Sequence, residues 1–258
     1  MSKKLWLTLV LLGSLATGWP ASAQQRDASE LLQCAQANWN ALSFVGVITI
    51  KVFRPDFSNA FRLKVWTTAD NAQAMIRVLA PASEAGSAYV RNNDELWFYA
   101  PGVGQPVALP GSSLGAAFFG SDVAVEDLYR GTLDVRYDAK LLGTRTDGVT
   151  GQSVNRLQLV PKQGADVVYG KLELDLDAES CAVQHIDFYD QRQTVIREAT
   201  FSDFVEVKGL VFATRSVVSD LTQQGKFTEE VVESFELGTA IPEQRFTLAC
   251  LADEARCG

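Results

Sequence analysis

Histidine is nearly absent from this sequence, since His185 is the only one in 258 residues. Most arrangements of a nucleophile and a general base need a histidine. His185 stands two residues before Asp187 on the polar face of a predicted strand, where we expect it to be solvated. The sequence also lacks a glycine-rich phosphate loop, a His/Cys metal spacing and a nucleophile elbow. We therefore expect a protein that is not an enzyme and that has no catalytic residue, no metal and no cofactor.

An excess of positive charge is also missing. The chain has 23 lysines and arginines against 31 acids, a formal charge of -8, and no basic run exceeds two residues. Binding to phosphates requires a cationic surface that releases counterions. Nucleic acid is therefore excluded as an expected partner, and an anionic lipid surface is disfavoured.

No apolar run is long enough to cross a bilayer core, which needs about 20 residues. The run Leu5–Leu15 follows two lysines, and the small residues Ala21, Ser22 and Ala23 come after it. This pattern predicts a cleavable signal peptide, residues 1–23, with cleavage after Ala23 and export of the mature protein.

Removal of the predicted signal peptide takes away two lysines and no acid. The remaining 235 residues then carry 21 bases and 31 acids, a net charge of -10. No Ser/Pro-rich linker divides them. We expect one domain over residues 24–258, and we expect it to be a monomer.

The four cysteines are consistent with export to an oxidising compartment. Cys34, Cys181, Cys250 and Cys257 allow three complete pairings. Cys250 and Cys257 would close a short loop near the end of the chain. A bridge from Cys34 to Cys181 would join the first helix to the sheet, and the alternative is a buried, unpaired Cys34 on that helix.

The hydrophobic pattern predicts one helix followed mainly by strands. Asp27 can cap a helix over Ala28–Leu42, whose apolar residues recur at helical spacing. In the run 168–176 we expect Val168 and the leucines on one face and Tyr169 with the charged residues on a wet face. Further strands are predicted at Phe44–Phe53, Phe61–Val65, Gln184–Asp190, Val195–Phe201, Leu210–Val218 and Lys226–Leu237.

A succession of ten or more strands requires two packed sheets or one curled sheet. A single amphipathic helix that leads into such strands often fills the concave side of a curved sheet. The segment Pro110–Arg130, here called the flap, interrupts the strands with cap signals and apolar residues at helical separations. We expect it to be a short helical cover.

Several motifs resemble the LolA-like family of periplasmic outer-membrane lipoprotein-sorting proteins. They are L-W-F-Y-x-P at Leu96–Pro101, F-F-G-S-D-x-x-x-E-D-L at Phe118–Leu128, and L-Q-L-V-P-K at Leu157–Lys162. The opening helix, the hairpins from Val168 to Phe204 and a closing R-F-T are similar as well. The resemblance spans nearly the whole chain after the signal peptide.

The resemblance implies a mainly β fold of the α+β class. It implies a strongly curved antiparallel sheet that forms a half-barrel, with the N-terminal helix and the short helical flap covering its concave face. It also implies an apolar cavity that takes acyl chains. Shelter of a methylene group from water is worth about 0.8 kcal/mol, so a chain of about 16 carbons needs roughly 12 kcal/mol.

The candidate ligand contacts are aromatic or apolar. Phe118 and Phe119 lie in the flap next to glycines, where an exposed apolar pair is costly unless it covers something. Ordinary core packing is the alternative for every aromatic candidate. For the flap acids Asp122, Glu126 and Asp127 we expect helix capping and not metal binding. The full candidate set is Phe118, Phe119, Leu114, Trp97, Tyr99 and Trp66.

These observations favour a periplasmic carrier of lipid or lipoprotein acyl chains that transfers them between membrane partners. An inner-membrane exporter of the RND type and an outer-membrane acceptor are the expected partners. Three alternatives remain: a sensor of the same fold that regulates a protein partner, an accessory subunit that docks on an exporter, and a lipid hydrolase.

Overall fold

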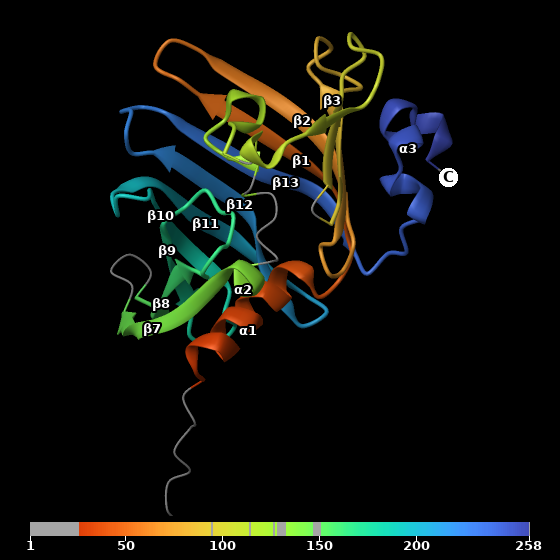
Figure 1. Cartoon of the computed structure of the whole chain (residues 1–258). Helices are drawn as coiled ribbons and strands as arrows, with labels where there is room; N and C mark the ends of the chain where they lie inside the picture. The colour runs from red at the N-terminus through yellow and green to blue at the C-terminus, as the bar shows by residue number, and fades with distance from the viewer. Residues whose placement is uncertain are drawn as a thin grey trace, which may run out of the picture.

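The computed structural model describes residues 26–93, 95–113, 115–125, 127, 133–146 and 151–257. Within these ranges, thirteen strands form one antiparallel sheet in the order β6-β5-β4-β3-β2-β1-β13-β12-β11-β10-β9-β8-β7. The sheet therefore consists of two meanders, β1–β6 and β7–β13, which are joined where β1 pairs with β13. It curls strongly but does not close (Figure 1). The expected curved, mainly β half-barrel is confirmed.

The strands are β1 Phe44–Phe53, β2 Ser58–Thr67, β3 Gln73–Ala80, β4 Ala88–Asn92, β5 Glu95–Tyr99, β6 Val107–Leu109, β7 Tyr137–Thr146, β8 Ser153–Pro161, β9 Lys171–Asp177, β10 Val183–Tyr189, β11 Val195–Val207, β12 Leu210–Asp220 and β13 Phe227–Leu237. The α-helices are α1 Ala28–Asn40, α2 Leu133–Arg136 and α3 Leu248–Ala252. Short 3₁₀ turns are η1 Gly111–Ser113, η2 Phe118–Gly120, η4 Glu243–Phe246 and η5 Glu254–Arg256. None of the described helices has the length and apolar character that a membrane span requires.

Helix α1 starts where the sequence predicts. The Asp27 side chain accepts a hydrogen bond from the backbone N–H of Glu30, and the Glu30 side chain accepts one from the backbone N–H of Asp27. This reciprocal capping box satisfies two donors that the first turn leaves unpaired. The helix ends at Asn40, two residues before the predicted end at Leu42.

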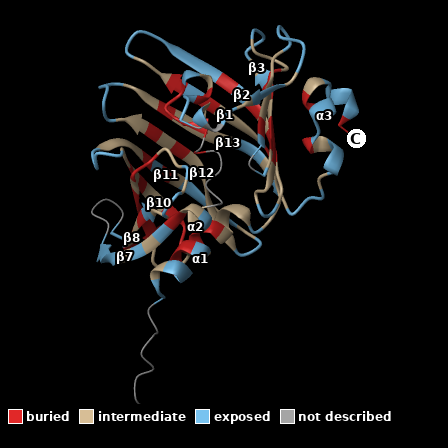
Figure 2. Cartoon of the chain, in the orientation of Figure 1, coloured by how far each residue is buried: buried red, intermediate tan, exposed pale blue. Residues whose placement is uncertain are grey.

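Helix α1 fills the concave side of the second meander. Leu31, Leu32 and Ala35 are almost fully buried against the inward side chains of β8 to β12. Figure 2 shows buried residues both on α1 and on the strands that it covers. We call this concave side the inner face and the opposite side the outer face.

Both disulfides were among the pairings that the sequence allows. Cys34 on α1 is bonded to Cys181, in the turn between β9 and β10, with Cα atoms 5.8 Å apart. Cys250 on α3 is bonded to Cys257, with Cα atoms 4.6 Å apart. The first bridge ties the helix to the sheet, and the second closes a loop in the C-terminal segment 241–257.

The C-terminal segment packs on the outer face of the first meander, away from α1 (Figure 1). Its buried residues Phe246, Cys250 and Leu251 contact apolar side chains of β2 to β5. The buried Arg77 guanidinium donates a hydrogen bond to the carbonyl of Cys250 at 2.7 Å. The first meander is therefore covered by protein on its outer face.

The described part of the flap contains two short 3₁₀ helices, η1 and η2, and a bridge between Ala117 and Ala124. The expected short helical flap is therefore present, in 3₁₀ and not α-helical form. One expectation about local structure needs correction. Tyr169 does not lie on a wet face but is buried in the core. It precedes β9, which begins at Lys171, so the alternation of that strand does not extend to it.

Candidate functional site

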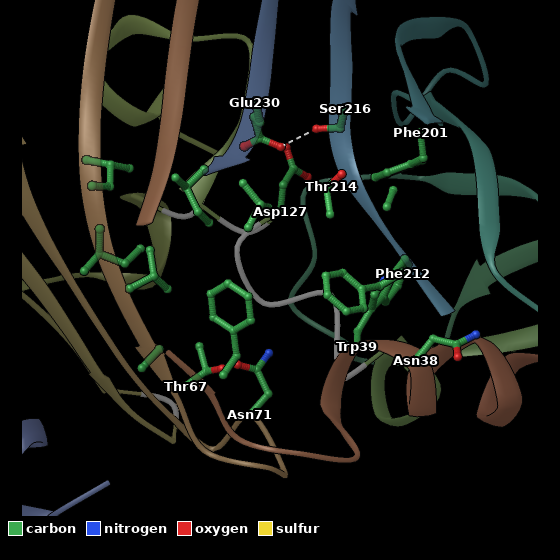
Figure 3. Close-up of a pocket in the computed structure, with 18 of the residues that line it drawn as sticks. Asn38, Trp39, Thr67, Asn71, Asp127, Phe201, Phe212, Thr214, Ser216 and Glu230 are labelled. Carbon is green, nitrogen blue, oxygen red and sulfur yellow. Dashed lines mark hydrogen bonds between the residues drawn. The ribbon is translucent and has the colours of Figure 1, made fainter. Parts of the chain in front are cut away.

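A cavity of about 290 Å³ lies on the inner face of the first meander, between this meander, helix α1 and strands β10–β13 (Figure 3). Its walls are mainly apolar. The apolar lining residues are Trp39, Phe44, Ile48, Ile50, Leu63, Val65, Ala74, Ile76, Leu96, Val183, Phe201, Phe204, Val211, Phe212, Ala213, Val232 and Leu237.

Strand alternation and register bring these residues together. Ile48 of β1 pairs with Leu63 of β2, and Gly46 pairs with Val65. Because successive side chains of a strand point to opposite faces, residues two apart form one continuous wall. Gly46 also leaves room for the ring of Phe44, which would clash with a Cβ atom at that position. The apolar wall that β1 and β2 contribute thus results from the alternation of side chains along each strand.

Helix α1 provides a further wall through Asn38 and Trp39. The Asn38 side chain donates to the carbonyl of Ser180 and accepts from the backbone N–H of Val211, both at 2.9 Å. These contacts and the Cys34–Cys181 disulfide hold the helix to the turn between β9 and β10 and to the start of β12. The helix that carries Trp39 is therefore tied to the sheet at two places.

The two flap phenylalanines pack at one end of the cavity. The Phe118 and Phe119 rings lie 4.7 Å apart, and both contact Tyr89, at 5.1 and 5.7 Å between centroids. Phe118 is only 1% exposed, and Phe119 stacks on Phe61 at 5.0 Å. Neither lines the cavity, whereas Tyr89 does. The pair therefore packs as core behind a lining residue.

Burial raises the pKa of Tyr89 to about 12. The hydroxyl of Tyr89 therefore stays neutral over an even wider pH range than that of an ordinary tyrosine. The ring thus presents an uncharged surface to the cavity.

Two buried acids anchor the flap. Asp122 forms an ion pair with Arg54 at 2.8 Å and accepts a hydrogen bond from the Thr228 hydroxyl at 2.7 Å. Asp127 accepts from the Tyr169 hydroxyl at 2.9 Å and lies 3.4 Å from Arg197. Asp127 also accepts a hydrogen bond from the backbone N–H of Ala124, which agrees with the capping role expected for the flap acids. Glu126 lies outside the described residues.

Three other candidates do not line the cavity. Trp66, Trp97 and Tyr99 lie in the cluster on the outer face, covered by the C-terminal segment. The Arg245 guanidinium sits 4.5 Å from the centroid of the Trp66 ring. Strand alternation directs these aromatics to the other side of the sheet, away from this cavity, so their expected contact with a ligand stays a prediction. The last candidate, Leu114, lies outside the described residues.

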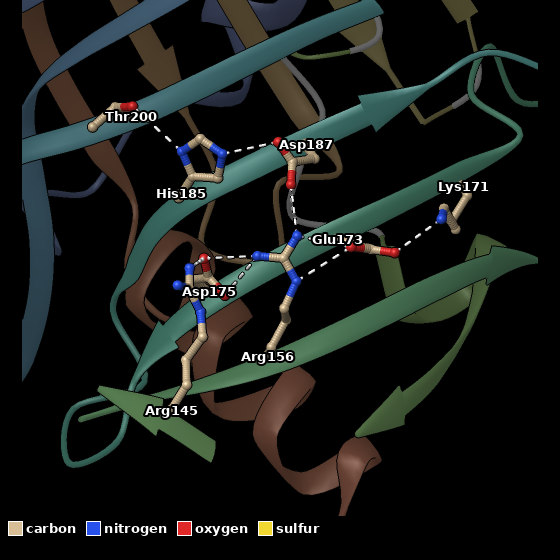
Figure 4. A network of polar contacts seen from close by, with 8 residues as sticks. All are labelled: Arg145, Arg156, Lys171, Glu173, Asp175, His185, Asp187 and Thr200. Carbon is tan, nitrogen blue, oxygen red and sulfur yellow. Dashed lines mark hydrogen bonds and ion pairs between the residues drawn. The ribbon is translucent and has the colours of Figure 1, made fainter. Parts of the chain in front are cut away.

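His185 belongs to a polar network on the outer face of the second meander (Figure 4). It contacts Asp187 at 2.9 Å, and Asp187 also accepts from Arg156 at 2.7 Å. Arg156 contacts Glu173 and Asp175 as well. The acids of this face are buried under these cations, so the predicted wet face is covered by ion pairs.

The ion pair shifts both pKa values. The hydrogen bond to Asp187 raises the pKa of His185, and the hydrogen bond to His185 lowers the pKa of Asp187. The oxygen atoms of Asp187 are occupied by His185 and Arg156. These contacts give the network a structural role.

The sequence reasoning missed most of the lining residues, and among them Glu230 is notable. Glu229 and Glu230 are adjacent on β13 and face opposite ways, as strand geometry requires. Glu229 pairs with Lys51 and Arg215 and does not line the cavity. Glu230 lines the cavity and accepts a hydrogen bond from Ser216 at 2.5 Å. The alternation along β13 predicted that Glu229 and Glu230 face opposite sides of the sheet. Which of the two faces the cavity could be known only from the structure.

Comparisons with solved structures place this architecture among the LolA-like half-barrels. A domain from Vibrio parahaemolyticus named as an outer membrane lipoprotein-sorting protein aligns with a TM-score of 0.78 and 18% identity, over 87% of this chain and 98% of that one. A LolA superfamily protein from Nitrosomonas europaea gives 0.74 and 23%, over 86% and 98%. A DUF1329 family protein from Desulfovibrio piger gives 0.76 and 20%, over 87% and 97%.

The fold is therefore that of the LolA-like lipoprotein-sorting proteins, which confirms the resemblance at the level of architecture. A sequence model of a family described only as "Uncharacterized protein" matches residues 70–253, more than half of the chain. The chain belongs to that family. No curated protein matches it in sequence.

Proposed function

We propose that this protein is a periplasmic carrier, not an enzyme, which holds an acyl chain of a lipid or lipoprotein in the cavity and transfers it between membrane partners. An RND-type exporter of the inner membrane and an acceptor in the outer membrane are the proposed partners. The observation that carries the proposal is the apolar cavity between α1 and the inner face.

The size and chemistry of the cavity support a single alkyl chain as cargo. Ligand pockets commonly measure about 300–1,000 Å³, so 290 Å³ lies just below the small end of that range. Each methylene group removed from water contributes about 0.8 kcal/mol. A mainly apolar wall with few polar groups provides this shelter without charged contacts along the chain.

The anchors around the cavity support a preformed site. Helix α1 is held by a disulfide, and the flap by the ion pair of Asp122 with Arg54 and by the contacts of Asp127. A rigid wall reduces the entropy that binding must overcome. Phe118 and Phe119 serve this proposal as packing that supports Tyr89, not as ligand contacts.

The periplasmic location rests on the predicted signal peptide and on the two disulfides. Disulfides persist in oxidising compartments such as the periplasm. Residues 1–23 lie outside the described residues, so N-terminal sequencing of the exported protein is the direct measurement of the predicted cleavage after Ala23.

A charge placed inside the cavity tests the carrier proposal. Ile48→Asp puts a carboxylate in the apolar wall and should weaken binding of a fluorescent fatty acid at least about tenfold, because ionised groups are costly to bury. Val47→Asp is the matched control, since Val47 is the neighbouring residue and does not line the cavity. Fluorescence titration of both mature variants, with thermal melts to verify folding, gives the comparison.

The native cargo provides the second measurement. Solvent extraction of protein purified from its own periplasm, followed by mass spectrometry, should recover a lipid. Absence of lipid, together with no binding of the fluorescent fatty acid, would overturn the carrier proposal. Equal loss of binding in both variants at full folding would place the site elsewhere.

A further inference from the structure

Glu230 is the acid of the cavity wall whose charge has no cation partner among the described residues. It projects from β13 into the cavity, as the close-up shows (Figure 3). Its hydrogen bond comes from the neutral hydroxyl of Ser216. The other lining acid, Asp127, lies 3.4 Å from Arg197 and is also bonded to Tyr169.

An ionised carboxylate has about four lone-pair sites for hydrogen bonds. One hydroxyl leaves most of this capacity unused, and the walls of the cavity as a whole are mainly apolar. Its neighbour on the outer face, Glu229, is by contrast satisfied by Lys51 and Arg215. A half-buried carboxylate beside apolar walls is therefore poised to accept hydrogen bonds from whatever enters.

The two basic side chains of the cavity lining are directed at other groups. Arg91 donates to the backbone carbonyls of Asn71 and Asn93, in the loops that flank β3 and β4. Arg215 donates to Glu229 on the outer face. Among the charged side chains of the lining, Glu230 is accordingly the one placed to accept hydrogen bonds from a ligand.

We propose that Glu230 binds the head group of the cargo, and that the cavity selects single-chain amphiphiles with a protonated amine over those with a carboxylate. The chain would lie against Ile48, Leu63 and Val65, and the amine would donate to the free lone pairs of Glu230. This inference rests on the proposed carrier function, because it assigns Glu230 as the binding residue for the polar end of the same cargo.

A pair of amphiphiles with the same chain tests the selection. Dodecylamine and dodecanoate, which at pH 7 carry opposite charges, displace the neutral fluorescent probe N-phenyl-1-naphthylamine from the mature protein. Dodecylamine should bind about tenfold more tightly, because a charge-assisted hydrogen bond is replaced by repulsion for dodecanoate. Glu230→Gln should bring this ratio close to one.

Glu229→Gln is the matched control, since it removes the same charge from the adjacent residue on the outer face. It should leave the ratio unchanged. Glu230→Lys is the second variant and should reverse the preference in favour of dodecanoate. Circular dichroism and thermal melts establish that each variant is folded.

The outcomes separate this inference from the carrier proposal. If the probe and both amphiphiles bind, but with a ratio that is the same in wild type and in the Glu230 variants, the head-group assignment is wrong and the carrier proposal stands. If neither the probe nor any amphiphile binds wild-type protein, both fail. An equal change of the affinity ratio in E229Q and E230Q would mean that the preference for the amine depends only on the net charge of the protein. This result would overturn the assignment of Glu230 as the head-group residue.

Discussion

The two meanders of the sheet have the same alternating pattern but fill their inner faces differently. In β7–β13, Leu31, Leu32 and Ala35 of α1 pack against much of the inner face and form a continuous core with it. In β1–β6 the flap covers one end only, through Phe118 and its neighbours. The cavity lies between the two meanders, and strands β1–β5 and β10–β13 both contribute to its lining. The second meander is therefore the half that α1 fills, and the cavity lies between this filled half and the first meander.

This division explains how the chain can keep a cavity at all. Unfilled apolar space weakens a protein because its walls lose dispersion contacts. Here α1 and the strands that it covers contribute a packed core beside the cavity, and the outer face of the first meander gains packing from the C-terminal segment. The packing of these other regions stabilises the fold, and this compensates for the dispersion contacts that the cavity walls lack.

The largest effect should come from the disulfide that joins α1 to the filled half. Cys34 and Cys181 are separated by 147 residues, for which the chain-entropy model gives about 5 kcal/mol. Cys250 and Cys257 are separated by 7 residues and should contribute about 2.4 kcal/mol. Urea unfolding of C34S/C181S and C250S/C257S measures both losses. Equal losses would contradict the expected dependence of the stabilisation on loop length.

The next largest difference should come from truncating one apolar side chain in each half and comparing the losses in the free energy of unfolding. Leu174 is fully buried in the second meander, and Leu174→Ala should lower the free energy of unfolding by about 3 kcal/mol. Ile48 already borders the cavity, so Ile48→Ala should cost only about 1 kcal/mol. Chemical denaturation gives both values. A larger loss for Ile48→Ala than for Leu174→Ala would mean that the cavity wall is part of the packed core.

The smallest effect concerns the outer face of the filled half and depends on pH. Asp187 raises the pKa of His185, so the stability from the pair is present below the ordinary histidine pKa of about 6.5 and is lost as pH rises through the raised value. The lowered pKa of Asp187 means that its share is present above about pH 4 and is lost as pH falls further.

His185→Gln should therefore cost about 1 kcal/mol near pH 5.5 and almost nothing at pH 9. Urea unfolding across this pH range measures the difference. Thr200→Val removes the other contact of the imidazole, at 3.4 Å, and should show no such pH dependence. A loss for His185→Gln that is constant with pH would show that the ion pair contributes nothing.

The sequence predicted the positions of helices and strands better than it predicted which side of each strand faces the cavity. The capped start of α1 and the bounds of β1 agree with the structure, because Asp27 and a β-branched run are strong local signals. Alternation also placed Leu172, Leu174 and Leu176 on one buried face. These features depend on neighbours along the chain.

The lining of the cavity could not be predicted in the same way. Trp66 and Trp97 have the hydrophobicity of ligand contacts, but they face the C-terminal segment, which returns from far along the chain. Trp39 lines the cavity although its pattern indicated only a buried helix face. Which side of a strand faces a cavity depends on the long-range pairing of β1 with β13 and on the covers of each face.

The open form of the sheet has a consequence for assembly. A half-barrel that gives access to a cavity has two edge strands, and unpaired edges invite pairing with other chains. Here β6 has only three residues, and β7 contains an irregular register between Leu141 and Gly143 with exposed Asp138, Lys140 and Arg145 along it. Short, interrupted and charged edges resist edge-to-edge aggregation. Both edges of the open sheet thus have features that discourage pairing with the strands of another chain.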